Sequence, residues 1–287
     1  MFQYLKAGLK GVGQVMLQDH ALTGMLFLSG IFWGSVIMGL SALLALLSSF
    51  LTAWIFRLDK DNLQKGLYGF SAVLVGVAVM LFFKPVWMSW VLVVIGSAAA
   101  TLLQHVFIKR SFPAFTFPFV AVTWVLLALV GKDMWLPVGD TTNPVFAISD
   151  WLLIPFTSFG QVIFQDKALS GFLFLAGVLV SAPVAAVYGF AAAIVSSAAA
   201  YFLGAPVDAV VAGLYGFNAV LCAIVFSGKQ WQDALWVLVS VAVSLGVTFL
   251  FFAWGLPQLT FPFVLATWVT MGVRGAPSLV RHLVRHL

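Results

Sequence analysis

The sequence predicts an all-α membrane protein with ten transmembrane helices and two re-entrant half-helices, arranged as two repeats of inverted topology. The chain is 63% hydrophobic and only 8% charged, with a mean hydropathy of +1.10, which leaves too little charge to cover a soluble surface. Its apolar runs are long and continuous, as in helices, whereas a transmembrane β-barrel alternates in segments of about ten residues. The sequence also contains two copies of one apolar unit, which is typical of channels and transporters.

The two copies are visible as three pairs of matching segments. These are GQVMLQDHALTGMLFLSG at 13–30 with GQVIFQDKALSGFLFLAG at 160–177, GLYGFSAVL at 66–74 with GLYGFNAVL at 213–221, and FPAFTFPFVAVTW at 112–124 with LPQLTFPFVLATW at 256–268. The first two pairs have an offset of 147 residues (161 − 14) and the third has 144 (260 − 116). We therefore interpret residues 1–287 as one membrane channel domain, with repeats at about 1–131 and 150–287 and a linker at 132–149.

Each copy predicts five membrane spans. They are expected near 22–40, 41–56, 66–83, 86–108 and 113–131 in the first copy, and near 169–187, 188–203, 211–227, 231–253 and 257–273 in the second. The boundary between the first two spans is placed at Gly39. Because five is an odd number, the second copy enters the membrane from the opposite side, which gives the inverted-repeat plan.

The distribution of positive charge predicts that both termini are cytoplasmic. With this orientation 11 of the 14 Lys and Arg residues fall on the cytoplasmic side, and Lys84, Lys132 and Lys167 fall outside. The excess of cytoplasmic Lys and Arg agrees with the positive-inside rule. We expect the membrane to be the plasma or inner membrane of the cell, and the pI near 9.5 to reflect these loops rather than nucleic-acid binding.

A short, partly apolar segment precedes the first span of each copy, at 5–18 and 152–165. Both segments are too short to cross about 30 Å of hydrocarbon. Each contains Gly-Gln-Val followed by a second Gln, and an amide buried in lipid without partners costs several kcal/mol. An interfacial amphipathic helix would explain the length, but it needs only generic polarity. We therefore favour a re-entrant half-helix that lines a polar cavity.

The last span of each copy is short and begins with Pro-x-x-Thr-x-Pro. The residues are Pro113, Thr116 and Pro118, and Pro257, Thr260 and Pro262. Proline removes a backbone donor and leaves nearby carbonyl groups without a helical partner. Short, proline-interrupted segments at corresponding positions of two repeats point to the transport site.

Together these motifs resemble the urea transporter family. The resemblance covers nearly the whole chain, because GLYGF, Thr-x-Pro-Phe and Gln-Val-x-x-Gln recur in order in both copies. It implies a homotrimer in which each protomer has a slot between the half-helices and the third and fifth spans, and passive conduction of urea without a coupled ion. By position, the narrow region would contain Gln14, Val15, Leu17, Phe70, Leu74 and Thr116, with the symmetry mates Gln161, Val162, Phe164, Phe217, Leu221 and Thr260.

The chemistry of these residues suits a planar, neutral, strongly hydrated solute. Gln oxygens, Thr hydroxyls and carbonyls freed by proline are acceptors for the four N–H groups of urea. Phe70 and Phe217 could form flat walls, although a plainer interpretation of the two rings is ordinary packing. Thr116 and Thr260 could instead bond their own helix backbone.

The sequence departs from the family after the second Gln, where members commonly carry Asn-Asn-Pro. Here the residues are Asp19-His20-Ala21 and Asp166-Lys167-Ala168. The two aspartates could cap the following helix or border a vestibule. The departure leaves open a channel for another small amide, such as acetamide or formamide.

An ion-coupled transporter and an enzyme are the remaining alternatives. Coupling needs an intramembrane acid or cation, and the candidates are Asp233 near a helix start and Asp208 in a loop. One cysteine, Cys222, excludes an internal disulfide and a cysteine-based metal cluster. With no Ser-His-Asp, metal or nucleophile arrangement visible, we expect no enzymatic activity and no cofactor. The expected partners are urea or a similar amide, membrane lipid and two further copies of the chain.

Overall fold

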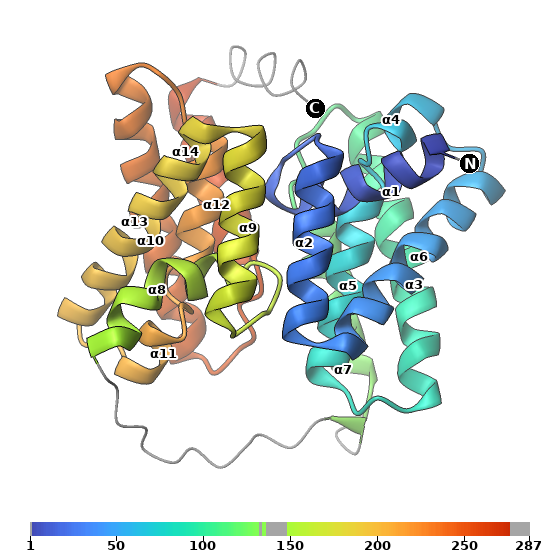
Figure 1. Ribbon diagram of the computed structural model, residues 1–287, viewed down its shortest axis with the longest axis horizontal. Coiled ribbons are helices and arrows are strands. Elements are labelled where there is room, and N and C mark those ends of the chain that lie inside the picture. The colour runs from blue at the N-terminus through green and yellow to red at the C-terminus, as the bar shows by residue number, and fades with distance from the viewer. Residues whose placement is uncertain (1, 132–133, 136–147, 276–287) are drawn as a thin grey trace. The chain divides into compact units, whose positions relative to one another are not determined.

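The computed structural model describes residues 2–131, 134–135 and 148–275, and it confirms the all-helical prediction for them. Beyond helices and turns, these residues form one isolated antiparallel bridge, between Phe83 and Trp135. The chain divides into two compact units, Met1–Asn143 and Pro144–Leu287 (Figure 1). Most of the linker predicted at 132–149 lies outside the described residues.

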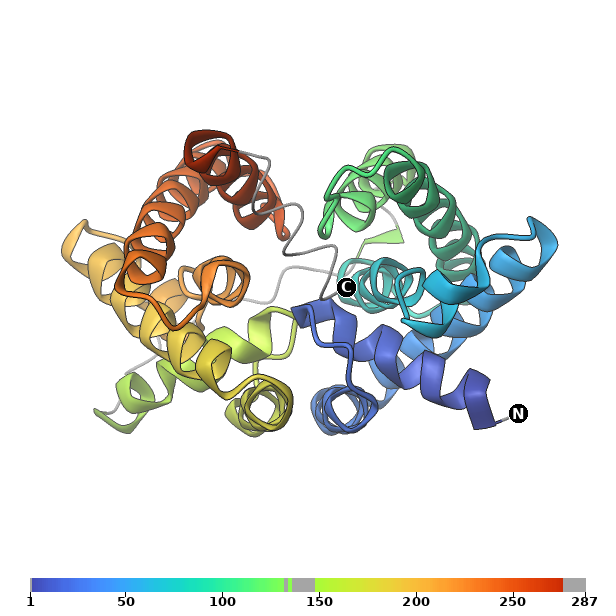
Figure 2. The same ribbon diagram turned by 90° about the horizontal axis from the view of Figure 1, so that it is seen from above.

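In the first unit, the other helices are arranged in an arc around one buried helix, α5 (Figure 2). Residues 69–80 of α5 are all buried, which explains why the hydrophobicity of this helix is not confined to one face. The elements of the unit are α1 (Phe2–Gly13), the 3₁₀ turn η1 (Gln14–Met16), α2 (Ala21–Gly34), α3 (Val36–Ile55), α4 (Lys60–Gln64), α5 (Gly69–Phe82), α6 (Trp87–Lys109) and α7 (Phe117–Leu129).

In its described residues, the second unit repeats this order of helices without a counterpart of η1, and α12 takes the place of α5. All residues of α12 except Val225 are buried. The elements are α8 (Ile148–Gln161), α9 (Ala168–Ser181), α10 (Pro183–Phe202), α11 (Val207–Val211), α12 (Phe217–Phe226), α13 (Trp231–Ala253) and α14 (Phe261–Arg274). The sequence repeat is therefore also a repeat of secondary structure.

Each of the ten expected spans overlaps mainly with one helix of this set. Four helices, α3, α6, α10 and α13, are long and apolar enough to cross a membrane, with mean hydropathy from 1.6 to 2.4. The bent pair of α1–η1 and α2 would make a fifth if it counted as one span. Five shorter apolar helices, α5, α7, α9, α12 and α14, complete the set. This content is that of an integral membrane protein.

The predicted boundary at Gly39 is wrong, because the helix break lies at Ser35. Ser35 has an extended backbone and its Oγ accepts a hydrogen bond from the Met38 N–H at 3.4 Å, which caps α3. Gly39 lies inside α3, where a Cβ atom would come within 2.5 Å of the Phe32 ring. In the second unit the break lies at Ala182, before Pro183, rather than at 187–188. A break of one residue between two apolar helices leaves hydropathy unchanged, so the sequence pattern did not reveal it.

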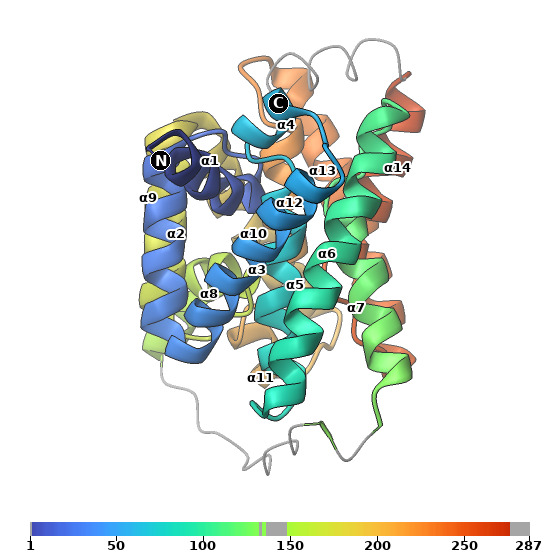
Figure 3. The ribbon, with the colours of Figure 1, turned by 90° about the vertical axis from the view of Figure 1, so that its right-hand side faces the viewer.

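The short segment before each first span is helical, as predicted. Residues Gln3–Met16 cross α2 at 74° (Figure 3). Glycine makes this crossing possible: a Cβ atom on Gly24 would lie 1.7 Å from the Leu9 carbonyl oxygen. A Cβ atom on the equivalent Gly171 would likewise lie 1.7 Å from the Phe156 carbonyl oxygen. The close approach of the two backbones is therefore built into both repeats.

Candidate functional site

In each unit, the three repeated motifs meet around one buried helix. Helix α5 contacts α1 and η1 on one side and α7 on another, and α12 contacts α8 and α14 in the same way. The Gln segment, the GLYGF segment and the Thr-x-Pro segment are therefore neighbours within each unit. This arrangement is what a transport site assembled from these motifs requires.

The GLYGF turn docks closely against α1 in the first unit and against α8 in the second. Gly66 and Gly213 have φ of +78° and +81°, a region that glycine enters without strain. A Cβ atom on Gly66 would lie 2.3 Å from the Gly11 nitrogen, and one on Gly213 would lie 2.5 Å from the Ser158 nitrogen. These two glycines thus act as close-packing positions, and they fix the start of α5 and α12 beside the Gln segment.

The two glutamines of each Gln segment have different surroundings. Gln18 Nε2 donates to the Met16 carbonyl at 2.7 Å, and Gln165 Nε2 donates to the Ile163 carbonyl at 2.9 Å. These second glutamines therefore close the turn that follows α1 in the first unit and α8 in the second. The turn also contains Leu17 and Phe164 in the left-handed region, with φ of 62° and 57°.

The first glutamines lie where α1 and α8 end. Gln14 is 2% exposed, and its Nε2 donates to the Lys65 carbonyl at 3.2 Å. This bond anchors the nitrogen end of the amide to the GLYGF turn, so that the oxygen is the end that can serve a solute. Gln161, the last residue of α8, is only half-buried. Val15 and Val162 beside them are fully buried.

The aromatic and aliphatic candidates of the third span occupy one face of a helix. Phe70 and Leu74 are four residues apart in α5, and Phe217 and Leu221 are four apart in α12, so each pair shares a face. The rings are 6% and 3% exposed. They stand in the first turn of their helix, close to the Gln segment.

The threonines stand where the last helix of each unit begins. Thr116 and Thr260 are the N-cap residues of α7 and α14, 3% and 0% exposed, and neither side chain caps its own helix. The preceding residues, Phe115 and Leu259, both have φ of 48°. A residue with a side chain adopts this conformation at a cost of about 1–2 kcal/mol. Strain retained at the same place in both repeats marks the two threonine loops as functional candidates.

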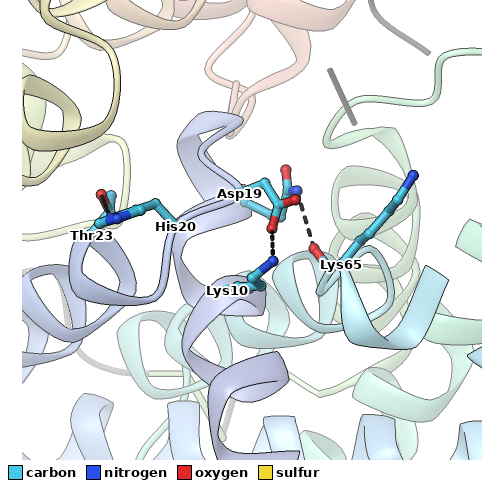
Figure 4. Close-up of polar contacts among 6 residues, drawn as sticks. Lys10, Asp19, His20, Thr23 and Lys65 are labelled. Carbon is cyan, nitrogen blue, oxygen red and sulfur yellow. Dashed lines mark hydrogen bonds and ion pairs between the residues drawn. The ribbon is translucent and has the colours of Figure 1, made fainter. Parts of the chain in front are cut away.

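The residues after the second Gln differ between the units. In the first unit Lys10 Nζ lies 2.8 Å from Asp19 Oδ1, and His20 lies 3.4 Å from Thr23, away from the ion pair (Figure 4). The ion pair is not repeated, because Thr157 stands at the place of Lys10. Neither aspartate caps the next helix, since the cap positions are His20 and Lys167.

Comparison with known proteins matches this geometry to one family. The family model described as "Urea transporter" matches residues 5–275, which include all three motifs in both copies. The chain belongs to the urea transporter family. The resemblance drawn from the motifs is therefore confirmed, and with it the expectation of a transporter rather than an enzyme.

Individual relatives cover most of this urea transporter. Urea transporter 1 of Capra hircus is 27% identical over 92% of this chain and 76% of its own length. Urea transporter 1 of Rattus norvegicus is 26% identical over 93% of this chain and 76% of its own length. Urea transporter 1 of Ovis aries is 26% identical over 92% of this chain and 76% of its own length. The similarity thus extends through both repeats.

Asp233, one of the two acidic residues considered for ion coupling, has structural partners in this transporter. Asp233 Oδ2 accepts from the Gln230 N–H at 3.0 Å in a capping box at the start of α13, and Asp233 Oδ1 lies 3.4 Å from Arg274 Nη2. Asp208 stands in the first turn of the short helix α11. In the described parts of the chain, no group of three His, Cys, Asp or Glu residues is placed to hold a metal ion.

Sequence reasoning missed two polar residues of the urea transporter's second unit, Asn218 and Gln258. Gln258 lies two residues before Thr260, and Asn218 is joined to this loop by hydrogen bonds to Gln258 Oε1 and the Leu259 carbonyl. The sequence did hold a signal, because Asn218 replaces Ser71 as the single difference between the two GLYGF segments.

Proposed function

We propose that the protein is a passive channel for urea, with one slot formed by its two repeats. The observation that carries this proposal is the family match over residues 5–275. The local geometry supports it, because both units bring the same three motifs around one buried helix.

The acceptors would replace the water that urea loses in the slot. The amide oxygens of Gln14 and Gln161 and the hydroxyls of Thr116 and Thr260 can each accept one of the four N–H groups. A conducting site must compensate dehydration without holding the solute tightly. Neutral acceptors meet this condition, since they are weaker than charged partners.

The walls of the slot would select by shape. Phe70 and Phe217 are flat, and a planar solute could pass edge-on between such rings. Apolar neighbours would keep the slot dry, which strengthens each hydrogen bond to the solute. These neighbours are Val15, Leu17, Leu74, Val162, Phe164 and Leu221.

We extend the proposal to the topology and assembly. The ten helices would be ten spans, and α1–η1 and α8 would be re-entrant half-helices of two inverted repeats. The termini would face the cytoplasm, as the Lys and Arg distribution indicates. Residues 1–287 would form a single channel domain, three copies of which assemble in the plasma or inner membrane.

Flux into proteoliposomes tests the function. Stopped-flow light scattering should show rapid urea uptake that is unchanged when proton, sodium or potassium gradients are imposed or collapsed. Acetamide, formamide, ammonia and water, measured in the same vesicles, give the selectivity. Urea uptake no faster than in empty liposomes would refute the proposal, and uptake that requires an ion gradient would replace the channel by a coupled carrier. Faster acetamide or formamide uptake would assign the channel to another amide.

A further inference from the structure

The two GLYGF segments differ at one residue, and this residue is buried in both units. Ser71 is 0% exposed and Asn218 is 1% exposed. They occupy equivalent positions, each directly after the candidate wall residue of its helix. A buried amide needs partners for both its donor and its acceptor ends, so the hydrogen bonds of Asn218 reveal what this position does.

Asn218 binds the chain on both sides of Thr260. Its Oδ1 accepts from the Phe263 N–H at 3.2 Å, and its Nδ2 donates to the Leu259 carbonyl at 3.4 Å. Nδ2 also lies 3.3 Å from Gln258 Oε1, and Gln258 Nε2 donates to the Leu214 carbonyl at 3.1 Å. We call Asn218 and Gln258 the amide clamp.

The clamp also caps a helix from outside. Phe263 is the third residue of α14, and its N–H is one of the donors that a helix leaves without an internal partner. An N-cap side chain normally accepts this bond, but the Thr260 side chain does not cap the helix. Asn218 of α12 supplies the acceptor instead, and thereby ties the start of α14 to α12.

The first unit forms the same loop without an amide clamp. Ser71 Oγ has no hydrogen-bond partner among the described residues, and Ala114 stands at the place of Gln258 (258 − 144). Nevertheless Phe115 has the same φ of 48° as Leu259. The loop conformation therefore does not depend on the clamp. In the second unit, the clamp adds hydrogen bonds that restrain the movement of the Thr260 loop.

We propose that Asn218 is a positioning residue that makes the Thr260 loop the stricter of the two selectivity sites. The inference rests on the proposed function, because it assumes that the solute passes Thr260. The Leu259 carbonyl has two lone pairs, so it can accept from Asn218 and from a solute together. A Leu259 carbonyl that the clamp holds beside Thr260 cannot retreat from a wider solute. The Thr116 loop has no such amide clamp, because Ser71 and Ala114 stand at the two positions.

The test compares the clamp with its counterpart in the first unit. Asn218→Ser should raise the permeability ratio of N-methylurea to urea about three- to tenfold, with urea flux itself changed less than about threefold. Ser71→Ala is the matched control: it removes a hydroxyl without a partner at the same depth, and the ratio should not change. Gln258→Met leaves the cap bond between Asn218 and Phe263 intact and should raise the ratio by less than Asn218→Ser. It also serves as the test variant if Asn218→Ser does not fold.

A second measurement does not depend on transport. Hydrogen–deuterium exchange of the peptide around residues 256–264 should be faster in Asn218→Ser, while the peptide around 112–120 in Ser71→Ala exchanges as in the wild type. Unchanged exchange would overturn the clamp, whatever solute the protein carries. Faster exchange with an unchanged permeability ratio would overturn its role in selectivity. Failure of the urea proposal itself would appear earlier, as absent urea flux in the wild type.

Discussion

The crossing of α1 over α2 depends on Gly24, and replacing this glycine by alanine should unfold the first unit or displace its Gln segment. The added Cβ atom would lie 1.7 Å from the Leu9 carbonyl oxygen and 2.5 Å from the Leu9 carbonyl carbon. Non-bonded Cβ atoms essentially never approach other heavy atoms closer than 3.0 Å. The two backbones must therefore separate by about 1.3 Å (3.0 − 1.7), and neither contact atom belongs to a side chain that could rotate away.

The expected cost of Gly24→Ala is at least 3 kcal/mol. Overpacking a core costs typically about 1–3 kcal/mol when side chains can adjust, and here the clash is between backbone and Cβ. In a chain of this size such a loss lowers the thermal midpoint by roughly 6–12 °C. Because Gln14 follows the crossing by only a few residues, urea flux should fall with the stability.

A matched control lies in α13. A Cβ atom on Gly246 would meet nothing within 4 Å, and alanine in an unobstructed helix interior is more stable than glycine by about 0.5–1 kcal/mol. Gly246→Ala should therefore leave flux unchanged and raise the midpoint slightly. The measurements are thermal unfolding in detergent, size-exclusion elution and urea flux in proteoliposomes. Equal midpoints for Gly24→Ala and Gly246→Ala would refute the steric argument.

Three further predictions concern the proposed path and the topology. Thr260→Val removes an acceptor worth roughly 1–3 kcal/mol and should slow urea flux about tenfold, whereas Thr260→Ser should retain most flux; equal flux in both variants would mean that the hydroxyl serves the backbone. Phe70→Ala should preserve the elution volume but admit bulkier amides, and unchanged size selectivity would make the ring ordinary packing. The third prediction uses a Cys222→Ser background with one new cysteine at a time. Lys84→Cys should react with an impermeant reagent from outside, whereas Lys229→Cys, in the equivalent loop, should react only after permeabilisation. Labelling of both from one side would contradict the inverted repeat.

Local sequence was sufficient for the long apolar helices, because apolar runs report burial or lipid contact residue by residue. It was not sufficient for their ends. The break at Ser35 depends on one capping bond to the Met38 N–H, and hydropathy does not distinguish this serine from the small residues around it. Hydropathy also did not show that Gly39, which was expected at a boundary, lies inside a helix and packs against Phe32.

The candidate site was predicted to the level of segments. Repetition in the sequence singled out the Gln, GLYGF and Thr-x-Pro motifs, and the structure brings the three together around α5 and around α12. The structure also shows that the two glutamines of the Gln motif have different roles, which the motif alone did not distinguish. Gln18 closes a turn, whereas Gln14 is tied to the Lys65 carbonyl 51 residues away.

The sequence by itself therefore determined the class of protein, the repeat and the family, because hydropathy and repeated residues are properties of the chain alone. Only the tertiary structure decided which glycines permit backbone contact and which amides hold a loop. The Leu9 carbonyl oxygen restricts Gly24, and the Phe263 N–H engages Asn218. These relations join atoms of different helices at distances of a few ångströms, and such distances exist only once the helices have packed.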